Sequence, residues 1–204
     1  MTNVTDSPSV ANILAVYNAA TADDLREGLA WYQTAHNWCV TMAGSKRPHL
    51  IARNAGIVAA LSPLNGWGNN KRKAAEVISK RGRIVVEPGK PNGIGLGNNV
   101  KKAIAIYNGA DPLDILGGDK VRAFYATILD PQGDIDPVID RHAFDIAVGE
   151  RTDEKRRGAL SRKGVYAEFA AAYREAAKIA GIGSAQMQAV TWIAWRNIHG
   201  IDAD

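Results

Sequence analysis

Apolar residues recur along most of this chain every third or fourth position, which is the spacing of one face of an α-helix. Two such faces comprise Leu25, Leu29, Tyr32, His36 and Val40, and Tyr166, Phe169, Tyr173, Ala176 and Ile179. No stretch alternates convincingly with the period of two that a half-buried strand requires. The pattern predicts an all-α fold of about eight to ten helices, without an internal repeat.

Caps, prolines and glycines set the limits of the predicted helices. Thr21 and Asp24 have the spacing of a capping box, and Gly44 ends the long helix that they open. Other expected caps are Asn98 or Asn99, Asp119, Asp140 and Ser184. The predicted helices span residues 10–20, 21–43, 48–61, 71–81, 98–107, 111–116, 119–129, 140–148, 165–180 and 184–198.

The 204 residues are enough for one helical domain, or for two tightly packed lobes, with a substantial core. Residues 1–9 are polar and are expected to form a flexible tail. Residues 83–97 are rich in glycine and proline, which predicts a surface loop or a short β-ribbon. Residues 151–164 are charged and are expected to form a mobile connector before C-terminal helices, residues 165–204, that pack on the N-terminal ones.

A helix, a glycine pair and a second helix over residues 111–129 predict a helix-hairpin-helix. Asp111 and Pro112 are typical of a helix start, and two glycines allow the sharp turn that follows. Such a turn presents backbone N–H groups to a phosphate, although a plain helical hairpin would have the same outline. The residues expected at this phosphate site are Gly117, Gly118, Asp119, Lys120 and Arg122.

Composition narrows the class of protein further. The net charge of +4 suits a nucleic-acid partner mildly, and basic residues gather at 71–73, 80–83, 101–102 and 151–163. Each basic group alone is explained equally well as a solvated surface. Cys39 is the only cysteine, which excludes a disulfide framework and a four-cysteine cluster. Without a long apolar run or a signal-peptide pattern at the start, we expect a soluble, cytoplasmic protein and no membrane partner.

A turn-rich loop between an apolar helix and a basic helix is the second candidate for DNA contact. Its small polar side chains could reach into a distorted duplex while its tryptophan stacks or wedges between bases. The residues assigned to this contact are Asn65, Trp67, Asn69, Asn70 and Lys71. The alternative is that the tryptophan fills the core and the asparagines cap the following helix.

Lys120 and Asp140 are the candidates for catalysis. If the loop over residues 130–137 folds back, the two side chains converge. A partly desolvated lysine at a helix start would have a lowered pKa and could act as a nucleophile, or it could simply bind a phosphate. The Asp140 carboxylate could stabilise positive charge on a sugar or accept a proton, and its plainer role is an N-cap. The spacing of the other aspartates fits no metal loop.

The segment Leu116-Gly-Gly-Asp-Lys120-Val-Arg-Ala, with Val138-Ile-Asp140-Arg-His142 after a loop, resembles the helix-hairpin-helix DNA glycosylases, the superfamily of endonuclease III and 8-oxoguanine glycosylase. The resemblance covers roughly residues 50–150. It departs from the family at Gly117-Gly118-Asp119, where a hydrophobic residue usually stands between two glycines, and at Ile139, which is one residue extra.

The resemblance implies two packed lobes with a cleft between them, Asp140 as the catalytic carboxylate and Lys120 as the nucleophile. It places Arg141 and His142 beside the DNA, with His142 orienting the loop or packing against the hairpin. It implies no cofactor, and it allows one monovalent cation bound by backbone carbonyls of the hairpin. The implied partner is double-stranded DNA, bound by a monomer.

Three functions are therefore open. The first is a DNA glycosylase, with or without lyase activity, that extrudes a modified or damaged base and cleaves its N-glycosidic bond. The second is a transferase that modifies a thymine-derived base, because Asp140-Arg-His142 and the segment 186–196 also look like phage-type offshoots of the superfamily linked to thymine hypermodification. The third is a DNA-binding module without catalysis.

Overall fold

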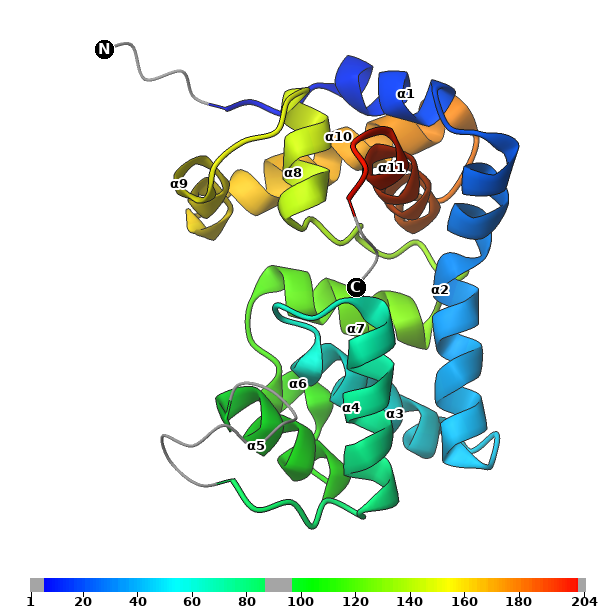
Figure 1. Ribbon diagram of the computed structural model, residues 1–204, viewed down its shortest axis with the longest axis vertical. Coiled ribbons are helices and arrows are strands. Elements are labelled where there is room, and N and C mark those ends of the chain that lie inside the picture. Colours follow the sequence, from blue (N-terminus) through cyan, green and yellow to red (C-terminus); the bar gives the residue numbers. More distant parts are fainter. Residues whose placement is uncertain (1–5, 87–96, 202–204) are drawn as a thin grey trace. The chain divides into compact units, whose positions relative to one another are not determined.

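The computed structural model describes residues 6–86 and 97–201, and these residues form eleven α-helices and one 3₁₀ helix with no strand (Figure 1). The prediction of an all-α fold is confirmed. The chain divides into two compact units, which are described separately below. Among the described residues, unit 1 holds 6–32 and 132–201, and unit 2 holds 33–86 and 97–131.

The helices of unit 1 are α1 (Val10–Asn18), the N-terminal part of α2 (Ala22–Ala43), α8 (Arg141–Val148), α9 (Glu154–Arg157), the 3₁₀ helix η1 (Gly158–Ser161), α10 (Val165–Ala180) and α11 (Ser184–Ile198). The helices α8, α10 and α11 pack on α1 and on one another. Their facing sides form a core of aliphatic and aromatic residues.

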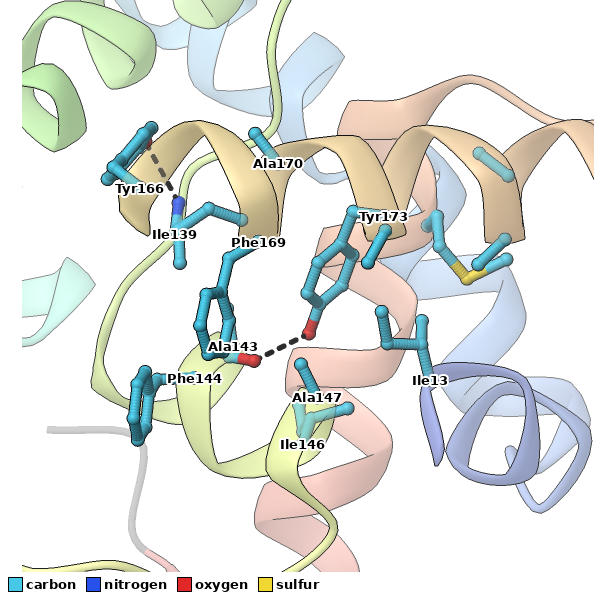
Figure 2. Packing of buried hydrophobic residues seen from close by; sticks show 14 of the residues in the cluster. Ile13, Ile139, Ala143, Phe144, Ile146, Ala147, Tyr166, Phe169, Ala170 and Tyr173 are labelled. Carbon is cyan, nitrogen blue, oxygen red and sulfur yellow. Dashed lines mark hydrogen bonds between the residues drawn. The ribbon is translucent and has the colours of Figure 1, made fainter. Parts of the chain in front are cut away.

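Aromatic residues of α10 organise the core of unit 1, as Figure 2 shows. The rings of Phe169 and Phe144 stack with their centroids 4.7 Å apart. The buried Tyr173 hydroxyl donates to the carbonyl oxygen of Ala143 at 3.2 Å. The Tyr166 hydroxyl accepts from the backbone N–H of Ile139 at 3.0 Å. These two tyrosines therefore anchor the segment on which Asp140 lies, because they bind the backbone on either side of it.

The start of α2 is built as the sequence predicts. The Thr21 N–H donates to Asp24 Oδ2 at 2.9 Å, and the Asp24 N–H donates to Thr21 Oγ1 at 3.1 Å. Burial raises the pKa of Asp24, but hydrogen bonds from Thr21 and Asn197 outweigh it and leave that pKa below its ordinary value. One turn later α2 runs against α11, since a Cβ at Gly28 would stand only 2.5 Å from the Cα of Val190.

Ion pairs hold the segments that were expected to be a tail and a mobile connector. Arg156 of α9 binds the carboxylate of Asp6 with its Nη2 at 2.5 Å. Arg157 binds the buried Asp145 of α8 at 2.7 Å, and the same carboxylate accepts from the backbone N–H of Thr152. Paired charges explain the order of a segment whose composition suggested disorder. Residues 1–5 of the expected tail lie outside the described residues.

Unit 2 consists of the C-terminal part of α2 with α3 (Pro48–Leu61), α4 (Trp67–Ser79), α5 (Gly97–Tyr107), α6 (Pro112–Ile115) and α7 (Asp119–Leu129). Helix α3 is buried over its C-terminal part and contacts α4, α5, α6 and α7. α6 comes close to α3 at Gly56, where a Cβ would lie 2.8 Å from Cγ of Pro112. His36 is a packed histidine as predicted, with Nδ1 2.9 Å from the carbonyl oxygen of Ile128.

Several helix starts differ from the prediction. Helix α4 begins at Trp67 rather than at Lys71, so its asparagines are helical residues and not loop residues. Helix α5 begins at Gly97, before either expected asparagine cap. The N-cap of α11 is Gly183, and Ser184 instead donates to the carbonyl oxygen of Ile135 at 2.7 Å.

These errors have a common reason. An amide or a hydroxyl serves inside a first turn as well as before it, so polarity alone does not fix the cap. In the expected ribbon, residues 83–86 are irregular, and residues 87–96 lie outside the described part of the chain.

Candidate nucleic-acid interface

The predicted helix, glycine turn and second helix over residues 111–129 are present in unit 2 as α6, Gly117-Gly118 and α7. Asp111 Oδ1 accepts the N–H of Leu113 at 2.8 Å, which caps α6. Leu116 is buried and ends this short helix, and Gly118 turns the chain with φ of 80°. A positive φ of this size favours glycine, so the turn depends on the second glycine of the pair.

The N-terminus of α7 is open. Its N-cap is Gly118, which has no side chain to accept a hydrogen bond, so the prediction that Asp119 caps this helix is wrong. Within the described chain, the N–H groups of Asp119, Lys120 and Val121 have no acceptor. Residues 117–120 are exposed. Free N–H groups at the positive end of a helix dipole attract an anion.

Arg122 binds backbone carbonyl oxygens of the hairpin. Its Nε donates to the carbonyl oxygen of Leu116 at 2.8 Å, and its Nη2 donates to that of Leu113 at 3.1 Å. Its guanidinium therefore closes the hairpin from one side, and contact of Arg122 with phosphate stays a prediction. A charged donor already binds two of the hairpin carbonyls that could have held a monovalent cation.

Lys120 is exposed on the first turn of α7. The nucleophile hypothesis assumed a partly desolvated lysine, and the structure contradicts that assumption. An exposed ammonium beside free backbone N–H groups is the arrangement of a phosphate contact.

Lys102 of α5 belongs to one of the basic groups noted in the sequence, but it was not among the predicted site residues. Its Nζ lies 4.0 Å from the position that a Cβ would take on Gly117. Its ammonium forms no ion pair within the described chain. The helical phase could have indicated it, since Val100, Ala103 and Ile106 form the buried face of α5.

The asparagines of the second candidate region are engaged inside the protein. Asn65 Nδ2 donates to the carbonyl oxygen of Leu61 at 2.7 Å. Asn65 Oδ1 accepts from Asn69 Nδ2 at 3.0 Å and from Lys73 Nζ at 2.5 Å. Asn70 is buried and donates from Nδ2 to the carbonyl oxygen of Val58 at 3.1 Å. The amides of Asn65 and Asn69 are therefore engaged within the protein and Asn70 is buried, while the assignment of these residues to DNA contact stays a prediction.

Trp67 is half-buried and packs at the start of α4. Its ring lies edge-on to Trp38, with the centroids 6.3 Å apart. The ammonium of Lys71 lies 5.3 Å from the centre of the same ring. This arrangement favours the packing alternative for Trp67 over the stacking one.

Lys73 is the buried lysine of this region, with 8% of its surface exposed. Burial lowers its pKa below the ordinary value, and the neighbouring charge of Arg72 lowers it further. The residue types alone do not indicate this difference, since Lys71, Arg72 and Lys73 are all basic. Lys73 differs from Lys71 and Arg72 only because it lies on the buried face of α4.

Asp140 lies in unit 1 as the N-cap of α8, as predicted. Its Oδ1 accepts the N–H groups of His142 at 2.9 Å and of Ala143 at 2.8 Å. Its Oδ2 accepts no hydrogen bond from the residues that the structure describes. The carboxylate is half-buried. Burial of Tyr32 raises the pKa of its hydroxyl, and the negative charge of Asp140 raises that pKa further. One carboxylate oxygen fixes the helix while the other keeps its acceptor capacity.

The two residues after Asp140 differ in exposure. Arg141 is exposed, and its Nε donates to His142 Nε2 at 3.2 Å. His142 is half-buried, and burial lowers its pKa below the ordinary value, against the attraction of Asp140. A histidine that is neutral at physiological pH can accept this hydrogen bond.

Comparison with known protein families identifies one match. A family described as a family of unknown function, DUF7178, matches residues 1–199. The chain belongs to DUF7178. No curated protein and no solved structure matches the chain.

The predicted site residues of this DUF7178 chain fall into three groups. The hairpin group, residues 117–120 with Arg122, gains Lys102 and lies in unit 2. The loop group, Asn65 to Lys71, lies in unit 2 as well. Asp140, Arg141 and His142 lie together in unit 1. Across residues 6–86 and 97–201, no three histidine, cysteine or acidic side chains gather as a metal site requires, and no helix has the length and apolarity to cross a membrane.

Proposed function

We propose that this chain is a DNA glycosylase that binds duplex DNA through the hairpin and cleaves the N-glycosidic bond of an extruded base. The open N-terminus of α7 carries the proposal. Among the residues that the structure describes, three backbone N–H groups without an acceptor, the exposed Lys120 and the unpaired ammonium of Lys102 surround one turn. Backbone N–H groups and lysines position a phosphate without reading sequence.

Asp140 supplies the chemistry in this proposal. When the bond between base and sugar breaks, the electron pair leaves with the base and the sugar becomes positively charged. A fixed carboxylate stabilises that charge, and its free oxygen can accept a proton from the attacking water. Asp140 suits this role because Oδ1 is held by two N–H groups while Oδ2 remains available. Neither role requires a metal ligand or a redox group.

Lys120 enters the proposal as a phosphate contact. A lysine nucleophile must lose its proton near neutral pH, and burial is the usual means of favouring that. Lys120 is exposed, so the geometry supports the glycosylase without the lyase step. A lyase would be revealed by a covalent protein–DNA adduct that borohydride traps and that Lys120→Ala abolishes.

The test uses duplexes that each carry one modified base, including 5-hydroxymethyluracil, uracil and 8-oxoguanine. We expect release of the free base from at least one duplex, measured by mass spectrometry. Asp140→Ser should lower the rate by about 10²-fold or more, since general catalysis of this kind contributes that much. The serine keeps the N-cap, so folding stability should stay within a few tenths of a kcal/mol. Full activity in Asp140→Ser would mean that Asp140 serves only as the N-cap of α8.

Other products would identify the alternatives. A heavier nucleoside with an intact glycosidic bond would assign the chain to base modification by transfer. Salt-dependent binding that survives Asp140→Ser, with no product from any duplex, would leave a DNA-binding module. Lys102→Gln and Lys120→Gln should each reduce the salt dependence of binding, because each removes about one phosphate contact. Ile179→Ala, on the exposed side of α10, is the matched surface control.

A further inference from the structure

The two units of the chain differ in charge. Among the described residues, and with histidine counted as neutral, unit 2 has 13 lysines and arginines against 5 acidic residues, a net charge of +8. Unit 1 has 11 lysines and arginines against 13 acidic residues, a net charge of −2. The excess positive charge therefore lies in unit 2. Such an asymmetry is typical of a chain in which one part binds a polyanion.

The few acidic residues of unit 2 are unevenly placed. Four of the five lie within residues 111–130, on or beside α6 and α7: Asp111, Asp114, Asp119 and Asp130. The fifth, Glu76 of α4, lies 2.7 Å from the ammonium of Lys80 and 3.9 Å from the guanidinium of Arg72. The positive charge of α3 and of the turn after α4 therefore has no acidic residue of its own segment to balance it.

Three arginines of unit 2 meet around one tyrosine, Tyr107 at the end of α5. The guanidinium carbon of Arg53, on α3, lies 4.5 Å from the centre of the Tyr107 ring. Gly82 packs against the same ring, since a Cβ there would stand 3.0 Å from Tyr107 Cδ1. Arg81 and Arg83 flank Gly82, and both are exposed. Within the described chain none of these three arginines, here called the arginine surface, forms an ion pair.

The turn that carries two of these arginines is fixed by its own backbone. The N–H of Gly82 donates to the carbonyl oxygen of Val77 at 2.9 Å, and that of Arg83 donates to the carbonyl oxygen of Lys80 at 3.0 Å. The φ of Arg81 is +53°, in the left-handed region that favours glycine or asparagine. Glycine would form this turn with less strain, so the turn alone does not explain an arginine at this position.

Arg53 is held in place as well. Its Nε and Nη2 each donate to Asn54 Oδ1 at 3.4 Å, and its guanidinium lies over the Tyr107 ring. Side chains that are ordered before binding lose little conformational entropy when a partner arrives. A guanidinium also presents paired N–H donors that match two oxygens of one phosphate. The arginine surface therefore has the charge and the donor geometry for phosphate.

We propose that the arginine surface is a second contact of unit 2 with the phosphate backbone of duplex DNA, separate from the hairpin turn. This proposal rests on the proposed function, because it assumes a duplex partner. A duplex carries one phosphate per about 1.7 Å of its axis, whereas an extended acidic peptide offers at most one charge per about 3.3 Å. Guanidinium groups that surround a single ring are better satisfied by the denser array, so the geometry favours DNA over an acidic protein.

The experiment counts phosphate contacts. Fluorescence anisotropy measures the affinity of the wild-type protein for a labelled duplex over a range of KCl concentrations, and the slope of log affinity against log salt reports the phosphates bound. In the triple variant Arg53→Gln, Arg81→Gln and Arg83→Gln we expect this slope to fall in magnitude by about 2 to 3. Affinity near physiological salt should fall by about tenfold or more.

A matched control removes the same charge from unit 1. Arg151→Gln, Arg162→Gln and Lys163→Gln replace three exposed cations by the same amide, and their combined slope should stay within about 0.5 of wild type. An equal loss in both triple variants would mean that net charge alone matters, which overturns the arginine surface. Circular dichroism shows whether each variant is folded. The three single variants, each expected to lower the slope by about 0.9, keep the test decisive if the triple variant does not fold.

The outcomes separate the two proposals. No binding of the wild-type protein to any duplex overturns the proposed function, and the arginine surface falls with it. Duplex binding with an unchanged slope in the triple variant overturns the arginine surface alone, because Lys102→Gln and Lys120→Gln report on the hairpin turn separately. Binding of the wild type to polyglutamate that is tighter than to the duplex, and is lost in the triple variant, would assign the surface to an acidic protein and would also overturn the proposal.

Discussion

Helices α7 and α8 begin in opposite ways. At α8 the N-cap is Asp140, whose Oδ1 accepts two backbone N–H groups. At α7 the N-cap is Gly118, and the first N–H groups find no acceptor within the described residues. The surroundings differ in the same sense, because α8 is mostly buried whereas residues 117–120 are exposed. One helix start satisfies itself, and the other leaves its donors for a partner.

The two helix starts therefore suit different kinds of chemistry. A helix start that lacks a cap can bind an anion, so α7 suits the DNA backbone. A capped start fixes a carboxylate precisely, so α8 suits a reacting group. The two helix starts look alike in the sequence, because each has an aspartate followed by a basic residue. Five substitutions test this contrast between the two helix starts.

The largest effect should come from Asp145→Ala, which tests whether α8 is a rigid support for Asp140. The change leaves the Arg157 guanidinium without its buried partner and removes the acceptor of the Thr152 N–H. We expect a loss of about 3–5 kcal/mol in the free energy of unfolding, measured by chemical denaturation. Asp134→Ala, at an exposed carboxylate, should change it by less than about 0.5 kcal/mol. An equally small loss for both would contradict a rigid α8.

Arg122→Gln tests how the hairpin is closed. The substitution removes two charge-assisted hydrogen bonds to the carbonyl oxygens of Leu116 and Leu113. We expect a loss of about 1–3 kcal/mol, seen as faster hydrogen exchange of the Leu116 amide and weaker duplex binding. The exposed Arg26 provides the control as Arg26→Gln. If the hairpin remains as protected in Arg122→Gln as in the control, the guanidinium is not what closes it.

Gly118→Ala should strain the start of α7. With φ of 80°, an alanine there costs about 1–2 kcal/mol or forces the turn to change. No heavy atom lies within 4 Å of the Cβ that would be added, so the cost is one of backbone conformation alone. Thermal unfolding measures it, and Gly158→Ala, which meets equally open space at a negative φ, is the control.

Asp140→Ala should cost about 1 kcal/mol, because two N–H groups of α8 lose their acceptor. Asp140→Ser should restore most of that stability, since a serine hydroxyl also caps. Denaturation of both variants measures the difference. At α8, then, removing a side chain destabilises the helix start, whereas at α7 adding one does. Equal stability of the two variants would mean that the cap contributes little.

The smallest effect concerns acid. Burial lowers the pKa of His142 below its ordinary 6.5. The negative charges of Asp140 and Asp145 oppose this shift, and the positive charges of Arg141 and Arg196 add to it. The unfolded chain therefore binds a proton before the folded chain does, and stability falls as pH drops below about 6.5. Between pH 7 and pH 5 this protonation should lower the free energy of unfolding by less than about 1 kcal/mol, and His142→Gln should abolish that decrease. The exposed His49 gives the control His49→Gln, and the same loss in both variants would refute this origin.

The sequence predicts most of the fold, because helices and their caps depend on neighbours within four residues. The capping box at Thr21 and Asp24, the start at Asp111 and the cap at Asp140 all follow from local hydrogen bonds. The ordered segment around α9 does not, since it depends on Arg156 reaching Asp6, 150 positions away. Charge content indicates solvation unless the partner of each charge is known.

The candidate site was less predictable, because it depends on the direction of long side chains. Arg122 and Lys120 lie two positions apart, yet one binds carbonyls of its own hairpin and the other is exposed. Lys73 is the third residue of a basic run, and only packing makes it a buried donor to Asn65. Leu64, in the turn before α4, has a φ of +61° that the sequence does not indicate, since leucine is not a residue that positive φ favours.

The contact between α2 and α11 has a consequence for how this family can vary. At Gly28 any side chain would collide with the backbone of Val190, which cannot rotate away as the end of a side chain can. Position 28 is therefore closed to all other amino acids wherever the two helices keep this spacing. In a library that samples every residue at every position, Gly28 should tolerate no replacement, whereas Gly158, with open space around it, should tolerate many.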